Sequence, residues 1–263
     1  MDSERGGHEK SERYRDFFDL QLRFAEAVAE KTSMPIAEAV LLTTNLHRRF
    51  GLGDAPAEGA PGPAWQEYAR GLKGLTTHRQ RADWTQIFYA RSPEEPSAFP
   101  DHVFGCFKFD ASDATDIVRL HFSNRDASNR DSLGPLSKAR AEVRRCELKS
   151  MFAFIKARFP NAGYVEGRSW LYGTEAYRRL FPDDYAGSRV IIESGNRFQG
   201  MSRWGQVLDR EGRVKPELKD KFLKNIERLN ADRLWEAFPL PSFRVRAPID
   251  VFYERGSLLR DRA

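Results

Sequence analysis

Apolar residues near the start of the chain recur every three or four positions, which is the spacing of an amphipathic helix. The first such run covers residues 14–29 and carries the apolar positions Phe17, Leu20, Phe24 and Val28. Similar patterns predict further helices over residues 35–50, 64–75 and 79–89. The first part of the chain is therefore expected to be mostly helical.

A linker and a polar tail mark the limits of this helical part. Residues 53–63 are rich in Gly, Pro and Ala, which is typical of a connecting segment. The residues before the first helix are almost entirely polar. We expect a disordered tail over residues 1–15 and a helical region over residues 16–100.

After residue 101 the pattern changes to short runs that predict strands. Residues 103–109 and 115–122 are separated by a polar turn, so they predict an antiparallel hairpin. A long amphipathic helix is expected over residues 137–158, followed by a short strand over residues 162–168. This change of character predicts a second, α/β domain over residues 101–263.

The order strand, loop, helix, strand has a consequence for the site. Two strands joined through a helix can lie parallel, with a right-handed crossover. The strands at residues 117–122 and 162–168 would then end at the same edge of the sheet, where open α/β sheets bind ligands. That edge would bring His121 together with residues 166–172.

The remaining pattern predicts helices and strands in mixed order. The expected elements are helices over 174–180 and 216–229, and strands over 188–193, 204–208, 243–245 and 249–253. The expected fold class is thus α/β (α+β), with an N-terminal helical region followed by a mixed sheet flanked by helices.

Composition agrees with a globular protein, since 40% of the residues are hydrophobic and 12% are aromatic. No apolar run approaches the roughly 18 residues that span a bilayer, and the first residues lack the apolar core of a signal peptide. We therefore expect a cytoplasmic protein without membrane association. The two cysteines, Cys106 and Cys146, are too few for a zinc site or a disulfide framework, so no metal is expected.

The net charge of +5 arises from 43 basic and 38 acidic residues. Acidic and basic residues alternate along the chain, as in Arg228, Asp232, Arg233 and Glu236. Because nucleic-acid-binding proteins more often concentrate Lys and Arg in one stripe, this pattern argues against a nucleic-acid partner. An anionic small molecule, such as a phosphorylated cofactor, is compatible with it.

The polar loop over residues 123–133 is a candidate anion-binding site. It precedes the long helix, whose N-terminal dipole favours negative charge. The groups it supplies are Asn124, Arg125, Asn129, Arg130 and Ser132. The alternative is an ordinary exposed loop, because Asp126 and Asp131 oppose anion binding.

The ends of the two expected parallel strands carry groups suited to proton transfer and to a polar pocket. His121 can act as a general base near neutral pH, although a single histidine on a strand is more often structural. Glu166 can accept a proton if burial raises its pKa, and the alternative is an ion pair with an arginine. The neighbouring residues Arg168, Ser169 and Trp170 can form a polar pocket.

A second candidate loop covers residues 193–206 and follows a predicted strand. Loops positioned by a rigid sheet commonly carry binding groups, and this loop supplies Asn196, Arg203 and Trp204. The alternative is a mobile connector, which its glycines would allow.

Four motifs follow one another in the second half of the chain: Ile117-Val-Arg-Leu-His121, Gly134-Pro-Leu-Ser137, Phe159-Pro160 and Ser169-Trp-Leu171. In this order they resemble the GNAT-like acyltransferase superfamily, and in particular bacterial proteins with a helical N-terminal part and a divergent GNAT-like C-terminal domain. The resemblance implies two central strands that splay apart, with the arm of an acyl-CoA entering between them. Those strands would be residues 117–122 and 162–168.

The resemblance also implies an activity. An acyl group would move from a thioester donor, acyl-CoA or a carrier protein, to an amine or hydroxyl of a small-molecule acceptor. The implied roles are a base (Glu166 or His121), an acid for the leaving thiolate (Tyr172), donor contacts (Arg125 and Arg130) and an acceptor pocket (Arg168, Arg203 and Trp204). The chain lacks a Gly-rich pyrophosphate loop between strand and helix. A different thioester, or a non-catalytic module that binds a small anion or a protein in the same crevice, therefore remains open.

Overall fold

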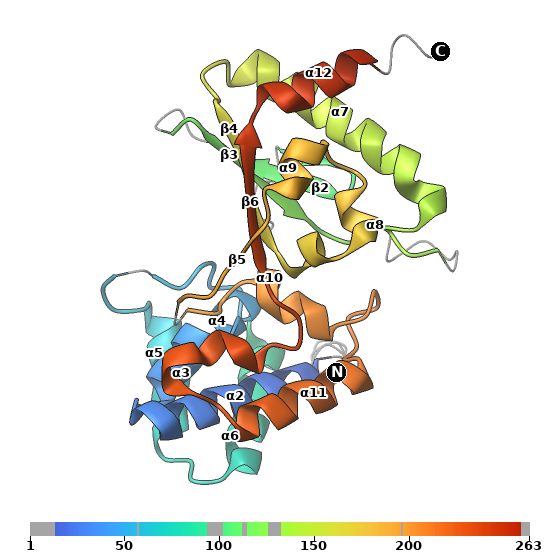
Figure 1. The fold of residues 1–263 in the computed structure, drawn as a ribbon. Helices are drawn as coiled ribbons and strands as arrows, with labels where there is room; N and C mark the ends of the chain where they lie inside the picture. The colour runs from blue at the N-terminus through green and yellow to red at the C-terminus, as the bar shows by residue number, and fades with distance from the viewer. Residues whose placement is uncertain are drawn as a thin grey trace. The chain divides into compact units, whose positions relative to one another are not determined.

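The chain folds into two compact units (Figure 1). The computed structural model describes residues 14–56, 58–93, 102–111, 115–125, 133–195 and 197–258, with side chains to residue 254. The first unit contains Met1–Pro96 and Glu193–Pro239, and the second contains Ser97–Ile192 and Leu240–Ala263. The mixed α/β class expected from the sequence is confirmed.

The first unit is built from helices. The early part of the chain contributes α2 (Arg15–Thr32), α3 (Ile36–Thr43), α4 (Leu46–Arg49), α5 (Pro63–Lys73) and α6 (His78–Arg91). The later part contributes α10 (Met201–Trp204), the 3₁₀ helix η4 (Gly205–Val207), α11 (Pro216–Glu227) and the 3₁₀ helix η5 (Ala231–Ala237). Local signals set several of these starts, such as Pro63 in the first turn of α5 and a Thr77–Gln80 capping box on α6.

The boundary of this unit differs from the expected one. The segment Glu193–Pro239 was expected in the sheet domain, but it packs with the N-terminal helices because its rings enter their core. Phe24 of α2 lies with its ring centre 5.6–5.9 Å from those of Phe198, Trp204, Phe222 and Phe238. Aromatic pairs at such distances add to the stability gained from burial.

The second unit contains a six-stranded sheet in the order β1-β2-β3-β4-β6-β5. Its strands are β1 (Val103–Phe104), β2 (Phe107–Asp110), β3 (Ile117–Phe122), β4 (Tyr164–Ser169), β5 (Val190–Ile191) and β6 (Phe243–Pro248). The expected antiparallel pairing of the first hairpin is confirmed between β2 and β3. The expected first strand is broken into β1 and β2 by a turn at Gly105, whose φ of 58° suits glycine.

Two strand predictions are wrong. Residues 204–207 belong to helical turns, because helical spacing lets Trp204 and Val207 both reach the core of the first unit. Leu208 forms only an isolated bridge with Val214. Residues 249–253 begin α12 (Asp250–Leu258). Helical spacing there buries Ile249 and Phe252 on one side, and the Phe252 ring stacks on Phe152 of α7 (Ala141–Arg158) at 4.2 Å.

The helices of the second unit lie on one face of the sheet (Figure 1). They are α7, α8 (Glu175–Arg178), α9 (Asp183–Gly187) and α12. The strand residues on that face, including Phe107, Val118 and Val165, form one apolar core with the helices. The opposite face carries the alternate residues of each strand, and these are mostly polar.

Candidate functional site

The predicted site lies where the pairing between β3 and β4 ends. The two strands are parallel, as expected, and pair from Ile117–Tyr164 to Leu120–Gly167. Their pairing then stops, although β3 stays paired with β2 to Phe122 and β4 stays paired with β6 to Ser169. The ends of these two central strands are therefore held by their outer neighbours and not by each other.

Gly167 is the last residue of β4 that pairs with β3, and the structure requires a glycine there. A side-chain Cβ at this position would overlap the hydroxyl groups of Tyr172 and Tyr185. These two hydroxyls lie 2.8 Å apart and share a hydrogen bond. A pair of phenol groups thus reaches the sheet backbone at the point where the pairing of the two strands ends.

The tyrosine cluster behind Gly167 is fully buried. Burial raises the pKa of Tyr172, Tyr177 and Tyr185 well above the usual value, because an ionised phenol would lose its hydration. All three hydroxyls are therefore protonated at neutral pH and can donate hydrogen bonds. Tyr172, expected as an acid for a leaving group, lies on the helix-covered side of the sheet and is 1% exposed.

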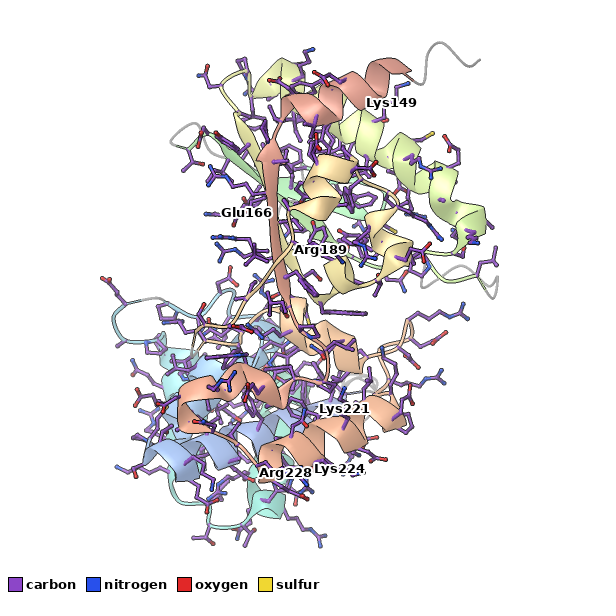
Figure 2. All side chains as sticks on the ribbon, viewed as in Figure 1. Lys149, Glu166, Arg189, Lys221, Lys224 and Arg228 are labelled. Carbon is purple, nitrogen blue, oxygen red and sulfur yellow. The ribbon has the colours of Figure 1, made fainter. Side chains whose placement is uncertain are left out.

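Glu166 lies on the opposite face of β4 and is 5% exposed. Arg168, two residues along the same strand, donates from Nε to Glu166 Oε1 at 2.8 Å. The register places Arg119 of β3 and Arg246 of β6 beside Glu166. In Figure 2 this residue lies on the side of the sheet that α7 and α12 leave uncovered, among side chains that end in nitrogen.

His121 lies on the same face as Glu166, one residue beyond the last β3–β4 pair. Its side chain is 45% exposed, and Nε2 lies 3.4 Å from Asp110 Oδ2. The structure therefore brings both expected base candidates to one face at the predicted sheet edge. The Glu166 carboxylate is therefore shielded from solvent, whereas the His121 imidazole is accessible to it.

The residues after Arg168 have local structural roles. Ser169 Oγ accepts a hydrogen bond of 3.1 Å from the Leu171 backbone N–H and so begins the 3₁₀ helix η3 (Trp170–Gly173). Trp170 is partly buried at the first position of this helix. The turn carries Tyr172 back under β4, which accounts for its contact with Gly167.

The loop expected to bind a phosphate is described only in part. Asn124 is partly buried and Arg125 is exposed, both just after the end of β3. Asn129, Arg130 and Ser132 lie outside the described residues.

The second expected loop belongs to the first unit. Trp204 belongs to the first unit, where it is fully buried and its Nε1 donates to the Thr43 carbonyl at 3.1 Å. Arg203 lies over the Phe198 ring at 5.1 Å, and burial lowers its pKa to about 10. Both side chains therefore pack in the core of the first unit. Asn196 lies outside the described residues.

The sequence reasoning missed Tyr185, Arg119 and Arg246. Tyr185 reaches Gly167 only through tertiary folding, and no local pattern indicates this contact. The two arginines alternate with buried apolar residues along their strands, which indicates that they are exposed, but only the pairing of the strands brings them beside Glu166. A shallow pocket lined by residues including Ile117, Phe159 and Ala162 lies at the opposite edge, where β3 and β4 begin.

No family model, curated protein or solved structure matches the chain. No helix within the described ranges has the length and hydropathy needed to cross a membrane. Across the same part of the chain, no group of three His, Cys, Asp or Glu residues is placed to hold a metal ion.

Proposed function

We propose that the protein is an acyltransferase that moves an acyl group from a thioester to an amine or hydroxyl of a small-molecule acceptor. The observation that carries the proposal is that the pairing of β3 with β4 stops after Leu120 and Gly167, while both strands stay paired with their outer neighbours. Where two parallel strands no longer pair, their backbone N–H and C=O groups can bind an extended donor arm. The arm then makes the hydrogen bonds that the two strands do not make with each other. The order of motifs that resembles GNAT-like acyltransferases agrees with this arrangement.

The groups at the end of the β3–β4 pairing can accept the proton of the acceptor and stabilise the leaving thiolate. The acceptor nitrogen or oxygen bonds to the thioester carbonyl carbon, and Glu166 takes the proton that the acceptor loses. The carbon–sulfur bond breaks, and the Tyr172 hydroxyl donates a hydrogen bond to the leaving thiolate, which takes its proton from solvent because the raised pKa of Tyr172 makes the phenol a weaker acid than the thiol. Glu166 releases its proton to solvent, so the products are an acylated acceptor and a free thiol.

The two groups lie on opposite faces of the sheet, which fits a donor that passes between the strands. The sulfur would lie on the side of Tyr172 and the carbonyl carbon on the side of Glu166. Because a thioester is already activated, correct placement supplies much of the rate. His121 is the alternative base, since it lies on the face of Glu166 and is open to solvent.

The positive charge of residues near the site favours one class of donor. Arg125 at the end of β3 and the arginines around Glu166 favour a donor with phosphate groups, such as acyl-CoA or the phosphopantetheine arm of a carrier protein. Such donors are substrates of cytoplasmic enzymes, and we propose the cytoplasm as the place of action.

The test is release of free thiol from acyl-CoA and from acyl carrier protein in the presence of a panel of amines and alcohols. We expect donor binding in calorimetry and acceptor-dependent thiol release. Glu166→Gln should slow release by roughly 100-fold or more, the usual contribution of a general base. Glu227→Gln, an exposed glutamate of α11, is the matched control and should leave the rate unchanged.

The same assay separates the alternatives. Full activity in Glu166→Gln together with loss in His121→Gln would transfer the role of base to His121. Donor binding without thiol release for any acceptor would favour a non-catalytic binding module. Failure of both donors to bind would refute the acyltransferase proposal.

A further inference from the structure

One face of the sheet in the second unit is exposed, while the other is covered by helices. On β3, Arg119 and His121 are exposed between buried apolar neighbours. On β6, Arg244 and Arg246 show the same alternation. The polar residues of neighbouring strands therefore form one continuous surface, which we name the open sheet face.

The open sheet face is strongly basic. Its cations come from four adjacent strands: Lys108 on β2, Arg119 on β3, Arg168 on β4, and Arg244 and Arg246 on β6. All four arginines are exposed, and Lys108 is partly exposed. Adjacent strands lie about 4.8 Å apart, and positions i and i+2 of one strand lie about 6.6 Å apart. The cationic side chains of this face thus start from neighbouring positions of the sheet.

The carboxylates on this face do not balance its charge. Glu166 is bonded to Arg168, and Asp110 stands opposite Arg119 in the register. Within the described part of the chain, no carboxylate forms an ion pair with Arg119, Arg244 or Arg246. This excess positive charge raises the affinity of the face for an anion.

The register adds an independent argument for an anionic ligand. Arg168 of β4 and Arg244 of β6 stand directly opposite each other. Like charges at such positions destabilise a sheet. Glu166, bonded to Arg168, offsets part of the repulsion, and an anionic group bound beside Arg244 would offset more of it.

The same face offers a surface on which bases can stack. The Arg246 guanidinium lies 4.2 Å from the centre of the Tyr164 ring, and Tyr164 is 37% exposed. Unpaired bases stack on aromatic rings and on arginine planes, which a flat sheet presents side by side. A duplex would need an element that enters a groove, and this face has none among the described residues.

We propose that the open sheet face binds single-stranded nucleic acid through its phosphates and bases. The alternation of acidic and basic residues along the sequence argued against such a partner. Only every second residue of a strand lies on a given face of the sheet, so a basic face is not apparent from the order of charges along the chain. The two proposals share Arg119, Arg168 and Arg246, which would also contact the donor's phosphates, but nucleic-acid binding rests on the cations of the open sheet face and not on the end of the β3–β4 pairing.

The experiment is titration of the full chain with fluorescent single-stranded oligonucleotides, RNA and DNA, followed by anisotropy at several salt concentrations. We expect saturable binding at low salt that weakens as salt rises. In a plot of the logarithm of the affinity against the logarithm of the salt concentration, each phosphate contact with a single strand contributes about −0.7 to the slope. Comparison of the RNA and DNA oligonucleotides shows which sugar is preferred.

Matched double variants test the surface itself. Arg119→Gln with Arg244→Gln removes two exposed cations of the open sheet face and should weaken binding roughly ten-fold, with a salt slope about 1.4 smaller in magnitude. Lys221→Gln with Lys224→Gln removes two exposed cations of α11 (Figure 2) and should change the affinity less than two-fold. Circular dichroism confirms that both variants remain folded.

Three outcomes would overturn the proposal. The first is no binding of either oligonucleotide at low salt. The second is equal loss of affinity in the two double variants, which would mean general charge attraction. The third is equal or tighter binding of a duplex, of vesicles containing anionic phospholipid, or of polyglutamate.

Discussion

At the scale of single residues, Gly167 links the sequence most directly to the site. It is the last β4 residue paired with β3, and the hydroxyls of Tyr172 and Tyr185 occupy the space that any side chain would need. Its backbone is extended and not left-handed, so the need for glycine comes from close packing. The glycine and the two tyrosines act as one structural unit.

Gly167→Ala should therefore destabilise the protein by about 1–3 kcal/mol, the usual cost of overpacking. Urea unfolding measures this change in the free energy of unfolding. Gly187→Ala is the control, because nothing lies within 4 Å of a Cβ at that exposed position of α9. Adding Tyr172→Phe to Gly167→Ala should restore part of the loss, because it removes the nearer hydroxyl. An unchanged stability of Gly167→Ala would contradict the packing.

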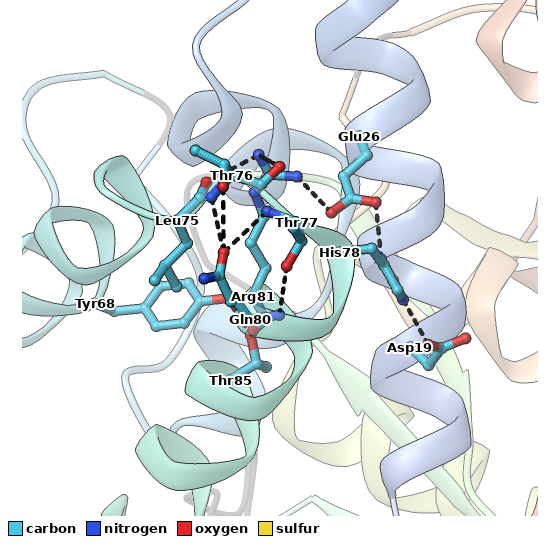
Figure 3. A network of polar contacts seen from close by, with 10 residues as sticks. All are labelled: Asp19, Glu26, Tyr68, Leu75, Thr76, Thr77, His78, Gln80, Arg81 and Thr85. Atoms are coloured by element: carbon cyan, nitrogen blue, oxygen red, sulfur yellow. Dashed lines mark hydrogen bonds and ion pairs between the residues drawn. The ribbon is translucent and has the colours of Figure 1, made fainter.

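At the scale of elements, His78 and Arg81 of α6 bind carboxylates of α2 in the first unit (Figure 3), and Arg81 donates to Glu26 Oε1 at 2.8 Å. His78 lies between two carboxylates of α2, with Nδ1 2.8 Å from Glu26 Oε2 and Nε2 2.6 Å from Asp19 Oδ1. Burial opposes a charge on Asp19, but hydrogen bonds from Arg23 and His78 outweigh it and lower the pKa of Asp19. These contacts therefore favour the ionised carboxylate.

His78→Gln should lower the free energy of unfolding by about 1–3 kcal/mol at neutral pH, as expected for hydrogen bonds to charged groups. Because the pKa of Asp19 is lowered in the folded protein, its contribution is present above the unfolded pKa of about 3.9 and is lost as the pH falls below it. The difference between wild type and variant should shrink below about pH 4. Arg79→Gln, whose ion pair with Asp83 is exposed, should change stability by less than about 0.5 kcal/mol.

The elements that the sequence predicted are those whose pattern is local. Strongly periodic helices and the parallel pair β3 and β4 follow from hydrophobic spacing and from the strand–helix–strand order. The placement of Glu166 and His121 at one sheet edge followed in the same way. The exposed arginines of β6 and the contact of Tyr185 with Gly167 could not be predicted, because they depend on which distant strand or helix lies alongside β4.

At the scale of the whole molecule, the chain contains two cores that do not follow sequence order. The segment Glu193–Pro239 leaves the sheet unit after β5 and returns to it before β6. A boundary at residue 101 was expected because the composition changes there. That local signal cannot reveal a segment that packs far back along the chain, since Phe198 and Trp204 meet Phe24 only in the folded state.

This organisation predicts which regions loosen together. Phe24→Leu removes ring contacts between α2 and α11, which is distant in sequence. Amide hydrogen exchange in α11 should become roughly ten-fold faster, which corresponds to a loss of about 1.4 kcal/mol in the free energy of opening. Exchange in β3 should change much less, because its residues belong to the other core. Mass spectrometry of peptic fragments measures both regions, and Gly167→Ala should give the reverse pattern. If Phe24→Leu loosened β3 as much as α11, the two cores would form one cooperative unit, and the division of the chain at residues 193 and 239 would have no energetic meaning.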